Sequence, residues 1–140
     1  MYKKILVPLD GSIIADLAVE HAVDLAKSLA AEVTFLHVIS ARSNINESGE
    51  TYQWFYQGLQ KNGQEIIEKA KEAYGNYGVV ISSKLIWGNP VEGICIEANE
   101  GRYDLIVMGS RGLSEIKGFL IGGVTNKVVR HASCPVLVVR

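Results

Sequence analysis

The sequence predicts an α/β fold, a single doubly wound sheet of five parallel strands with helices on both faces. Apolar, β-branched segments alternate along the chain with segments whose apolar residues recur every three or four positions. The strand segments are apolar almost throughout, as is typical of a parallel sheet covered on both sides. Right-handed crossovers between such strands place helices on both faces.

The first strand and helix are predicted within residues 3–31. Residues 3–9 are apolar and β-branched, and Asp10, Gly11 and Ser12 follow as a turn. Ser12 precedes a helical pattern over residues 13–31 and is expected to be its N-cap. The apolar face of this helix is predicted to comprise Ile14, Ala18, Ala22, Leu25 and Leu29.

A second strand is predicted at residues 32–39 and a small, polar loop at residues 40–51. Residues 52–77 are helical in character, although Gly58 and Gly63 each cost about 1 kcal/mol in a helix interior. The third helix starts after Asn89 as cap, with Pro90 at its first position. The remaining elements are strands at 79–87, 104–109 and 135–139 and helices at 90–100 and 123–133.

Composition narrows the possible classes of protein. A chain of 140 residues predicts one domain, residues 1–140. The net charge of −1 disfavours nucleic-acid partners, and no long apolar stretch or signal peptide indicates a membrane partner. Cys95 and Cys134 form no CxxC motif, which favours buried free thiols in a reducing compartment over a disulfide or redox pair. We therefore expect a cytoplasmic location.

Several common site motifs are absent. The sequence has no GxxxxGK[ST], no GxGxxG after the first strand and no GxSxG. His21, His37 and His131 lack metal-ligand spacing and are interpreted as structural or surface histidines.

A glycine-rich stretch, "GSRGLSEIKGFLIGGVT", joins the fourth strand to the last helix. Gly109, Gly112 and Gly122 follow the spacing G-x2-G-x9-G. Gly109 ends a strand where such sheets bind ligands, and Gly122 begins a helix whose free N–H groups attract anions. Two interpretations remain at this point: a phosphate cradle, or a connection whose glycines serve only backbone geometry.

From residue 3 to residue 140 the chain resembles the universal stress protein family. The resemblance rests on "KKILVPLDGS", "VTFLHVI" and "DLIVMGSRGLSEIKGFLIGGVTNKVVRHASCPVLVV". It implies a Rossmann-like sheet of the adenine-nucleotide alpha hydrolase-like type. It also implies binding of ATP, or of AMP or ADP, with Mg or Mn, and a homodimer through the last strand, residues 135–139. Members without the glycine motif do not bind nucleotide.

The resemblance also implies a set of site residues. Pro8 and Asp10 would lie beside the nucleotide, with Asp10 near the ribose or a metal–phosphate group. Val38 would meet adenine through its backbone, and Met108 would line the ribose side. The glycine motif and the helix after it would hold the phosphates. The implied ligand-binding residues are Pro8, Asp10, Val38, Met108, Gly109, Gly112, Gly122, Gly123, Val124 and Thr125.

Gly123 departs from the family pattern, because ATP-binding members usually have serine or threonine directly after the last motif glycine. A hydroxyl bonded to a phosphate contributes roughly 1.5–3 kcal/mol. We therefore expect nucleotide binding with a weaker hold on the terminal phosphates, to which Thr125 still offers a hydroxyl. Arg111 either adds charge to the phosphates or is a solvated side chain.

The leading functional hypothesis is an adenine-nucleotide-binding stress-response regulator with little or no ATPase activity, since no general base or arginine finger is assigned. One alternative is a dimeric interaction module that has lost nucleotide binding. Another is a nucleotide-using enzyme of the wider adenine-binding α/β group. The aromatic stretch with Tyr52, Trp54, Phe55 and Tyr56 is interpreted either as partial core packing or as an exposed contact surface.

Overall fold

The computed structural model describes residues 1–40, 50–112 and 121–140, excepting the side chains of residues 50–52. Each predicted strand and helix is present, with ends shifted by a few residues. Most of the predicted loop at 40–51 lies outside the described residues. The elements are β1 (Lys4–Pro8), α1 (Ile13–Leu29), β2 (Glu32–Ile39), α2 (Glu50–Tyr74), β3 (Ile81–Trp87), α3 (Pro90–Glu100), β4 (Leu105–Gly109), α4 (Gly123–His131) and β5 (Val136–Val139).

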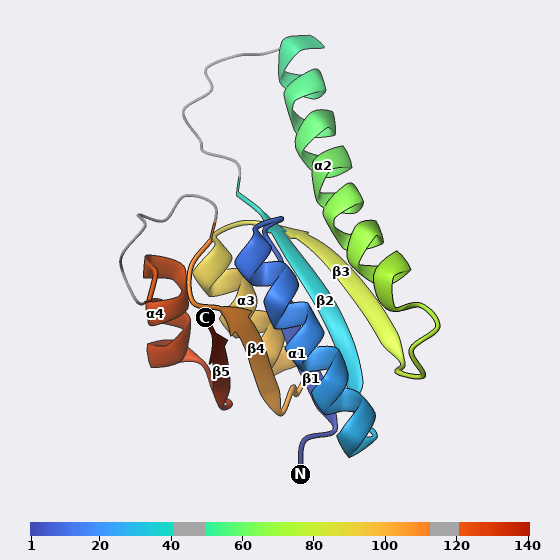
Figure 1. Cartoon of the computed structure of the whole chain (residues 1–140). Coiled ribbons are helices and arrows are strands. Elements are labelled where there is room, and N and C mark those ends of the chain that lie inside the picture. Colours follow the sequence, from blue (N-terminus) through green and yellow to red (C-terminus); the bar gives the residue numbers. More distant parts are fainter. Residues whose placement is uncertain (41–49, 113–120) are drawn as a thin grey trace.

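The five strands form one parallel sheet in the order β3-β2-β1-β4-β5, which confirms the predicted fold class (Figure 1). The chain starts with β1 at the centre, adds β2 and β3 on one side, and then crosses to add β4 and β5 on the other. The strand order therefore reverses between β1 and β4. Their carboxyl ends are the switch point at which a sheet of this kind leaves a crevice.

Alternate strand residues build two separate cores, one on each face of the sheet. Ile5, Val7 and Phe35 pack with α1 and α2, while Leu6, Leu36 and Ile106 pack with α3 and α4. All six side chains are fully buried. Burial on both faces explains why these strands lack the polar alternation of a half-exposed sheet.

The start of α1 confirms the predicted cap, but its core-facing side differs from the prediction. Ser12 Oγ accepts a hydrogen bond from Ala15 N at 3.1 Å. Leu29, predicted on the apolar face, is 40% exposed because α1 ends there and Ala30 takes a left-handed conformation. The buried positions are mostly alanines, which let the helix lie close to the sheet; they are Ala15, Ala18, Val19, Ala22, Val23 and Ala26.

The aromatic stretch at the start of α2 is largely exposed. Trp54 is 73% exposed and Phe55 is 40% exposed, so partial core packing is the wrong interpretation for Trp54. The Tyr56 ring packs against Trp87 of β3 with their centroids 5.2 Å apart. The side chain of Tyr52 lies outside the described residues.

The two glycines inside α2 have different surroundings, which leads to a testable prediction. A Cβ added at Gly63 would lie 2.7 Å from Leu85 Cδ1 and 2.8 Å from His37 Cδ2, whereas one added at Gly58 would meet nothing within 4 Å. Gly58→Ala should therefore raise the unfolding free energy by about 1 kcal/mol through helix propensity alone. Thermal unfolding should show a rise in Tm of about 3 °C. An unchanged or lower Tm would contradict this.

Cys95 and Cys134 are free thiols, as predicted, but both are only half-buried. Burial raises the pKa of each thiol, and for Cys134 nearby Asp104 raises it further. Both thiols therefore favour the protonated form. Within the part of the chain that the structure describes, no helix is long and apolar enough to cross a membrane.

Candidate functional site

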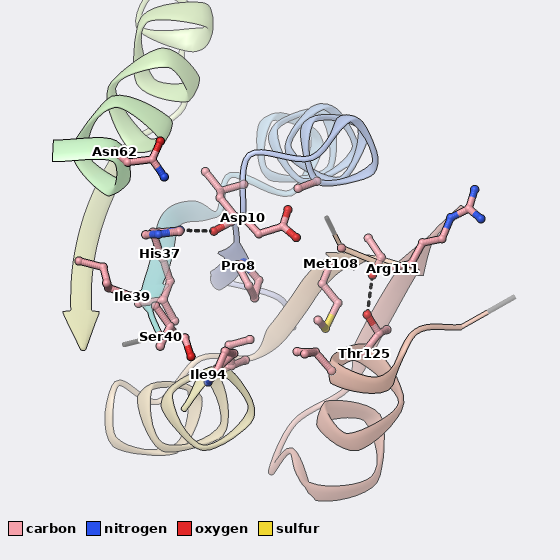
Figure 2. Close-up of a pocket in the computed structure, with 18 of the residues that line it drawn as sticks. Pro8, Asp10, His37, Ile39, Ser40, Asn62, Ile94, Met108, Arg111 and Thr125 are labelled. Atoms are coloured by element: carbon pink, nitrogen blue, oxygen red, sulfur yellow. Dashed lines mark hydrogen bonds between the residues drawn. The ribbon is translucent and has the colours of Figure 1, made fainter. Parts of the chain in front are cut away.

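A pocket of about 340 Å³ opens at the switch point of the sheet (Figure 2). The ends of β1, β2 and β4 form its floor, and α2, α3 and the start of α4 form its walls. Most of the residues implied by the family resemblance line it. These are Pro8, Asp10, Val38, Met108, Gly109, Gly112, Val124 and Thr125.

Gly122 and Gly123 are not among the lining residues but lie at the N-terminal end of α4. Gly122 is the N-cap, and its N–H donates to the Ser110 carbonyl at 2.6 Å. This bond ties the start of α4 back to the end of β4. The cap has no side-chain hydrogen bond, unlike the caps of α1 and α3. Because glycine has no side chain, the cap residue itself leaves the N-terminal end of α4 open to an anion.

Asp10 and Gly112 meet across the switch point. The Asp10 carboxylate accepts a hydrogen bond from Ser12 N through Oδ1 at 2.9 Å. A Cβ added at Gly112 would collide with the other carboxylate oxygen, Oδ2. Glycine at 112 therefore lets the loop after β4 lie directly against the Asp10 turn.

Gly109 plays a similar steric role at the end of β4. A Cβ there would lie 2.5 Å from Ile14 Cγ2 and 3.1 Å from the Ile14 carbonyl carbon, so a side chain at this position would push against Ile14 at the start of α1. Both motif glycines consequently have a steric role in the backbone geometry. The same close packing shapes the pocket, so this role is compatible with a phosphate cradle.

The backbone groups of Val38 face the pocket because successive residues of a strand point their N–H and C=O groups to alternate sides. The Leu9 N–H donates to Leu36 O at 2.8 Å, so the backbone groups of Leu36 point toward β1. In a parallel strand the residue two positions later points its N–H and C=O to the same side. Pairing between β1 and β2 ends at Pro8 and Leu36. The N–H and C=O of Val38 therefore point past the end of β1, where β1 offers no strand partner.

The Thr125 hydroxyl has a structural partner. It is 3% exposed and donates to the Gly109 carbonyl at 2.7 Å. A hydroxyl has one proton, so in this arrangement it cannot also donate to a phosphate. The expectation that this hydroxyl contacts phosphate does not fit the observed bond, although the residue lines the pocket.

Replacing Thr125 with valine tests this bond. The change keeps the shape of the side chain but leaves the Gly109 carbonyl without its partner. We expect a loss of about 1–2 kcal/mol in unfolding free energy, measured by denaturant titration. Thr125→Ser, which keeps the hydroxyl, should retain more of the stability. Equal losses in the two variants would show that the hydroxyl bond contributes little.

His37 lines the pocket, although its isolated position in the sequence favoured a structural or surface histidine. Its Nδ1 lies 2.7 Å from Leu9 O, and because a carbonyl can only accept, Nδ1 carries the proton. Its place in the sequence could have suggested a pocket residue, since His37 directly precedes Val38 near the end of β2. Asn62 of α2 was also missed and points toward the pocket from above His37 (Figure 2).

The pocket has few charged groups. Among its described lining residues Arg111 is the only lysine or arginine, and its guanidinium points away from the pocket (Figure 2). Among the described residues, the N-terminus of α4 also contributes positive potential to this side of the pocket. Within the described ranges no three histidine, cysteine or acidic side chains gather as a metal site. Asp10 could still contact a metal held mainly by phosphates, the way Mg²⁺ usually binds.

Comparison with known proteins supports the resemblance seen in the sequence. The sequence model of the universal stress protein family matches residues 1–140. The chain belongs to this family. Universal stress protein MJ0531 of Methanocaldococcus jannaschii is 35% identical over 141 residues, covering 100% of this chain and 83% of that protein.

Several solved structures share the fold. The hypothetical protein MJ0577 superposes with a TM-score of 0.88 at 34% identity, covering 99% of this chain and 96% of that one. An Arabidopsis thaliana family member with AMP bound has a TM-score of 0.74 at 26% identity, covering 98% and 90%. A universal stress protein in complex with cAMP has a TM-score of 0.65 at 26% identity, covering 99% and 97%. Relatives of this chain thus bind adenine nucleotides.

Proposed function

We propose that this universal stress protein binds an adenine nucleotide at the switch-point pocket and acts as a stress-response regulator in the cytoplasm. The observation that carries the proposal is the position of the pocket between the backbone of Val38, which lies beyond the last residue of β2 paired with β1, and the N-terminus of α4. The first offers hydrogen bonds to a base, and the second attracts an anion. The nucleotide-bound relatives support the same ligand class.

The base fits the apolar side of the pocket. Leu36, Val38, Ile94 and Met108 line it from the face that packs with α3 and α4. In this proposal, backbone groups of Val38 bond the edge of adenine, and Asp10 meets the ribose or a phosphate-bound Mg²⁺ or Mn²⁺. ATP, ADP and AMP share the base and ribose and would differ only in how α4 and the motif glycines hold their phosphates.

A thermal-shift titration tests nucleotide binding. Ligand at 100 times its Kd should stabilise the protein by about 2.7 kcal/mol. We expect a rise in Tm with AMP, ADP or ATP in the presence of Mg²⁺. The absence of any shift at millimolar concentrations would overturn the proposal. Mass spectrometry of small molecules released from freshly purified protein would identify the bound species.

A second candidate is a dimeric interaction module of the same family that no longer binds nucleotide. The glycine at 123 and the hydrogen bond of Thr125 to Gly109 favour it, because two expected hydroxyl donors are missing from the phosphate site. The titration above separates the two candidates.

We also propose a homodimer through β5. This strand is at the edge of the sheet, and Leu137 on it is 37% exposed, so pairing with a second copy would cover apolar surface and unpaired backbone groups. Sedimentation should give twice the 15.3 kDa chain mass. A single species at the chain mass would contradict the dimer.

Catalysis would be slow or absent under this proposal. The only described lysine or arginine that lines the pocket points away from it, so it does not act as an arginine finger in this arrangement. Phosphate release from ATP should therefore stay near that of a Gly112→Val control. Release well above the control would favour the nucleotide-using enzyme instead.

A further inference from the structure

His37 connects α2 to the turn that carries Asp10. On one side, its Nδ1–H donates to the Leu9 carbonyl at 2.7 Å. On the other side, its ring packs against Gly63 of α2, where an added Cβ would lie 2.8 Å from Cδ2. The ring thus occupies the space between the end of β1 and α2, and the missing side chain at 63 leaves room for it.

The bonded carbonyl determines the orientation of Asp10. The Leu9 carbonyl belongs to the peptide unit that includes the nitrogen and Cα of Asp10, and this unit is planar. Holding its oxygen therefore limits rotation of the backbone at Asp10. The Asp10 carboxylate in turn accepts from Ser12 N at 2.9 Å and lies against Gly112. A hydrogen bond at His37 can thus affect a carboxylate that it does not touch.

We propose that His37 is a positioning residue, which holds the Leu9–Asp10 peptide so that Asp10 is preset for the ligand. The inference rests on the proposed nucleotide site for its ligand. It predicts that His37 affects ligand binding through Asp10. It also predicts that a substitution in α2 that displaces the ring changes ligand affinity.

The ligand-based test measures AMP affinity by calorimetry. His37→Phe keeps a ring but loses the donor and should weaken AMP binding about 3- to 10-fold. His37→Asn keeps an N–H donor at similar reach and should bind within about twofold of the original chain. In an Asp10→Ala background, His37→Phe should change affinity by less than about twofold, because the group that it positions is gone. Additive effects of the two substitutions would overturn the inference, as would unchanged binding by His37→Phe.

A ligand-free test separates this inference from the proposed function. The Ser12 amide donates to Asp10, so its hydrogen exchange reports the geometry of the turn. In His37→Phe this amide should exchange about 3- to 10-fold faster, while amides in the middle of α1 keep their rates. A uniform acceleration along α1, or none at Ser12, would refute a positioning role. If the original chain binds no AMP, the proposed function fails and this exchange measurement alone decides the inference.

Substitution at Gly63 gives an independent route if His37→Phe does not fold. Gly63→Ala adds a Cβ that would lie 2.8 Å from His37 Cδ2 and 2.7 Å from Leu85 Cδ1, and by crowding the ring it should weaken AMP binding and speed exchange at Ser12. Gly58→Ala, in the same helix with nothing within 4 Å, is the matched control and should change neither. Equal behaviour of the two alanine variants would count against the proposal.

Discussion

Gly112→Val should lower the affinity for AMP by about 10- to 100-fold, corresponding to an overpacking cost of about 1–3 kcal/mol. The added Cβ overlaps the Asp10 carboxylate, whose Oδ1 is held by Ser12 N at 2.9 Å. The carboxylate cannot withdraw without giving up that bond, so either the turn or the loop after β4 must move. Both border the pocket. Calorimetric titration with AMP measures the loss.

Two controls isolate the collision as the cause. Gly58→Ala should bind AMP normally, because the site at 58 is open and outside the pocket. In an Asp10→Ala background the stability cost of Gly112→Val should shrink, since the colliding group is absent. Wild-type affinity in Gly112→Val, or an equal cost with and without Asp10, would show that the contact between the two residues does not shape the site.

Gly123→Ser should tighten ATP binding by about tenfold or more. A hydroxyl that bonds a charged phosphate contributes about 1.5–3 kcal/mol. Gly123 is the first residue of α4 and is exposed, so a side chain added there lies at the N-terminal end of the helix. The Thr125 hydroxyl already donates to Gly109 O at 2.7 Å and offers no substitute. AMP, which lacks the outer phosphates, should gain less than ATP.

Gly123→Ala is the matched control for this change. It alters the backbone freedom of position 123 in the same way but adds no hydroxyl. Parallel calorimetric titrations of the three proteins with ATP and AMP give the comparison. Equal tightening by alanine and serine would assign the effect to helix stability, and no gain with serine would place the outer phosphates away from residue 123.

Local patterns predicted the fold well because they have local causes. Ser12 and Asn89 both cap helices through side-chain oxygens, as their positions before apolar helical patterns indicated. The strand predicted at residues 32–39 has the observed bounds of β2. Strands that are apolar on both faces need helices to cover each face of the sheet. The layered architecture could therefore be predicted from the strand segments.

Contacts between distant segments account for what the sequence did not predict. His37 appears as an isolated histidine in the sequence, yet Leu9 and Gly63 on other elements determine its surroundings. Leu29 matched a helical spacing, but it is the last residue of α1 and is 40% exposed there. For Trp54 the sequence left partial core packing and an exposed contact surface open, and the fold leaves this side chain 73% exposed.

The sequence by itself determined the order and type of the elements, the helix caps and the glycine stretch, because these depend on neighbouring residues. Only the tertiary structure decided what the glycines do. Gly112 lies against Asp10 from another strand end, and Gly109 lies against the backbone of α1. It also decided that the Thr125 hydroxyl serves the end of β4 and that the Val38 backbone faces the pocket. Those outcomes depend on which strands are neighbours, a pairing that residue spacing does not encode.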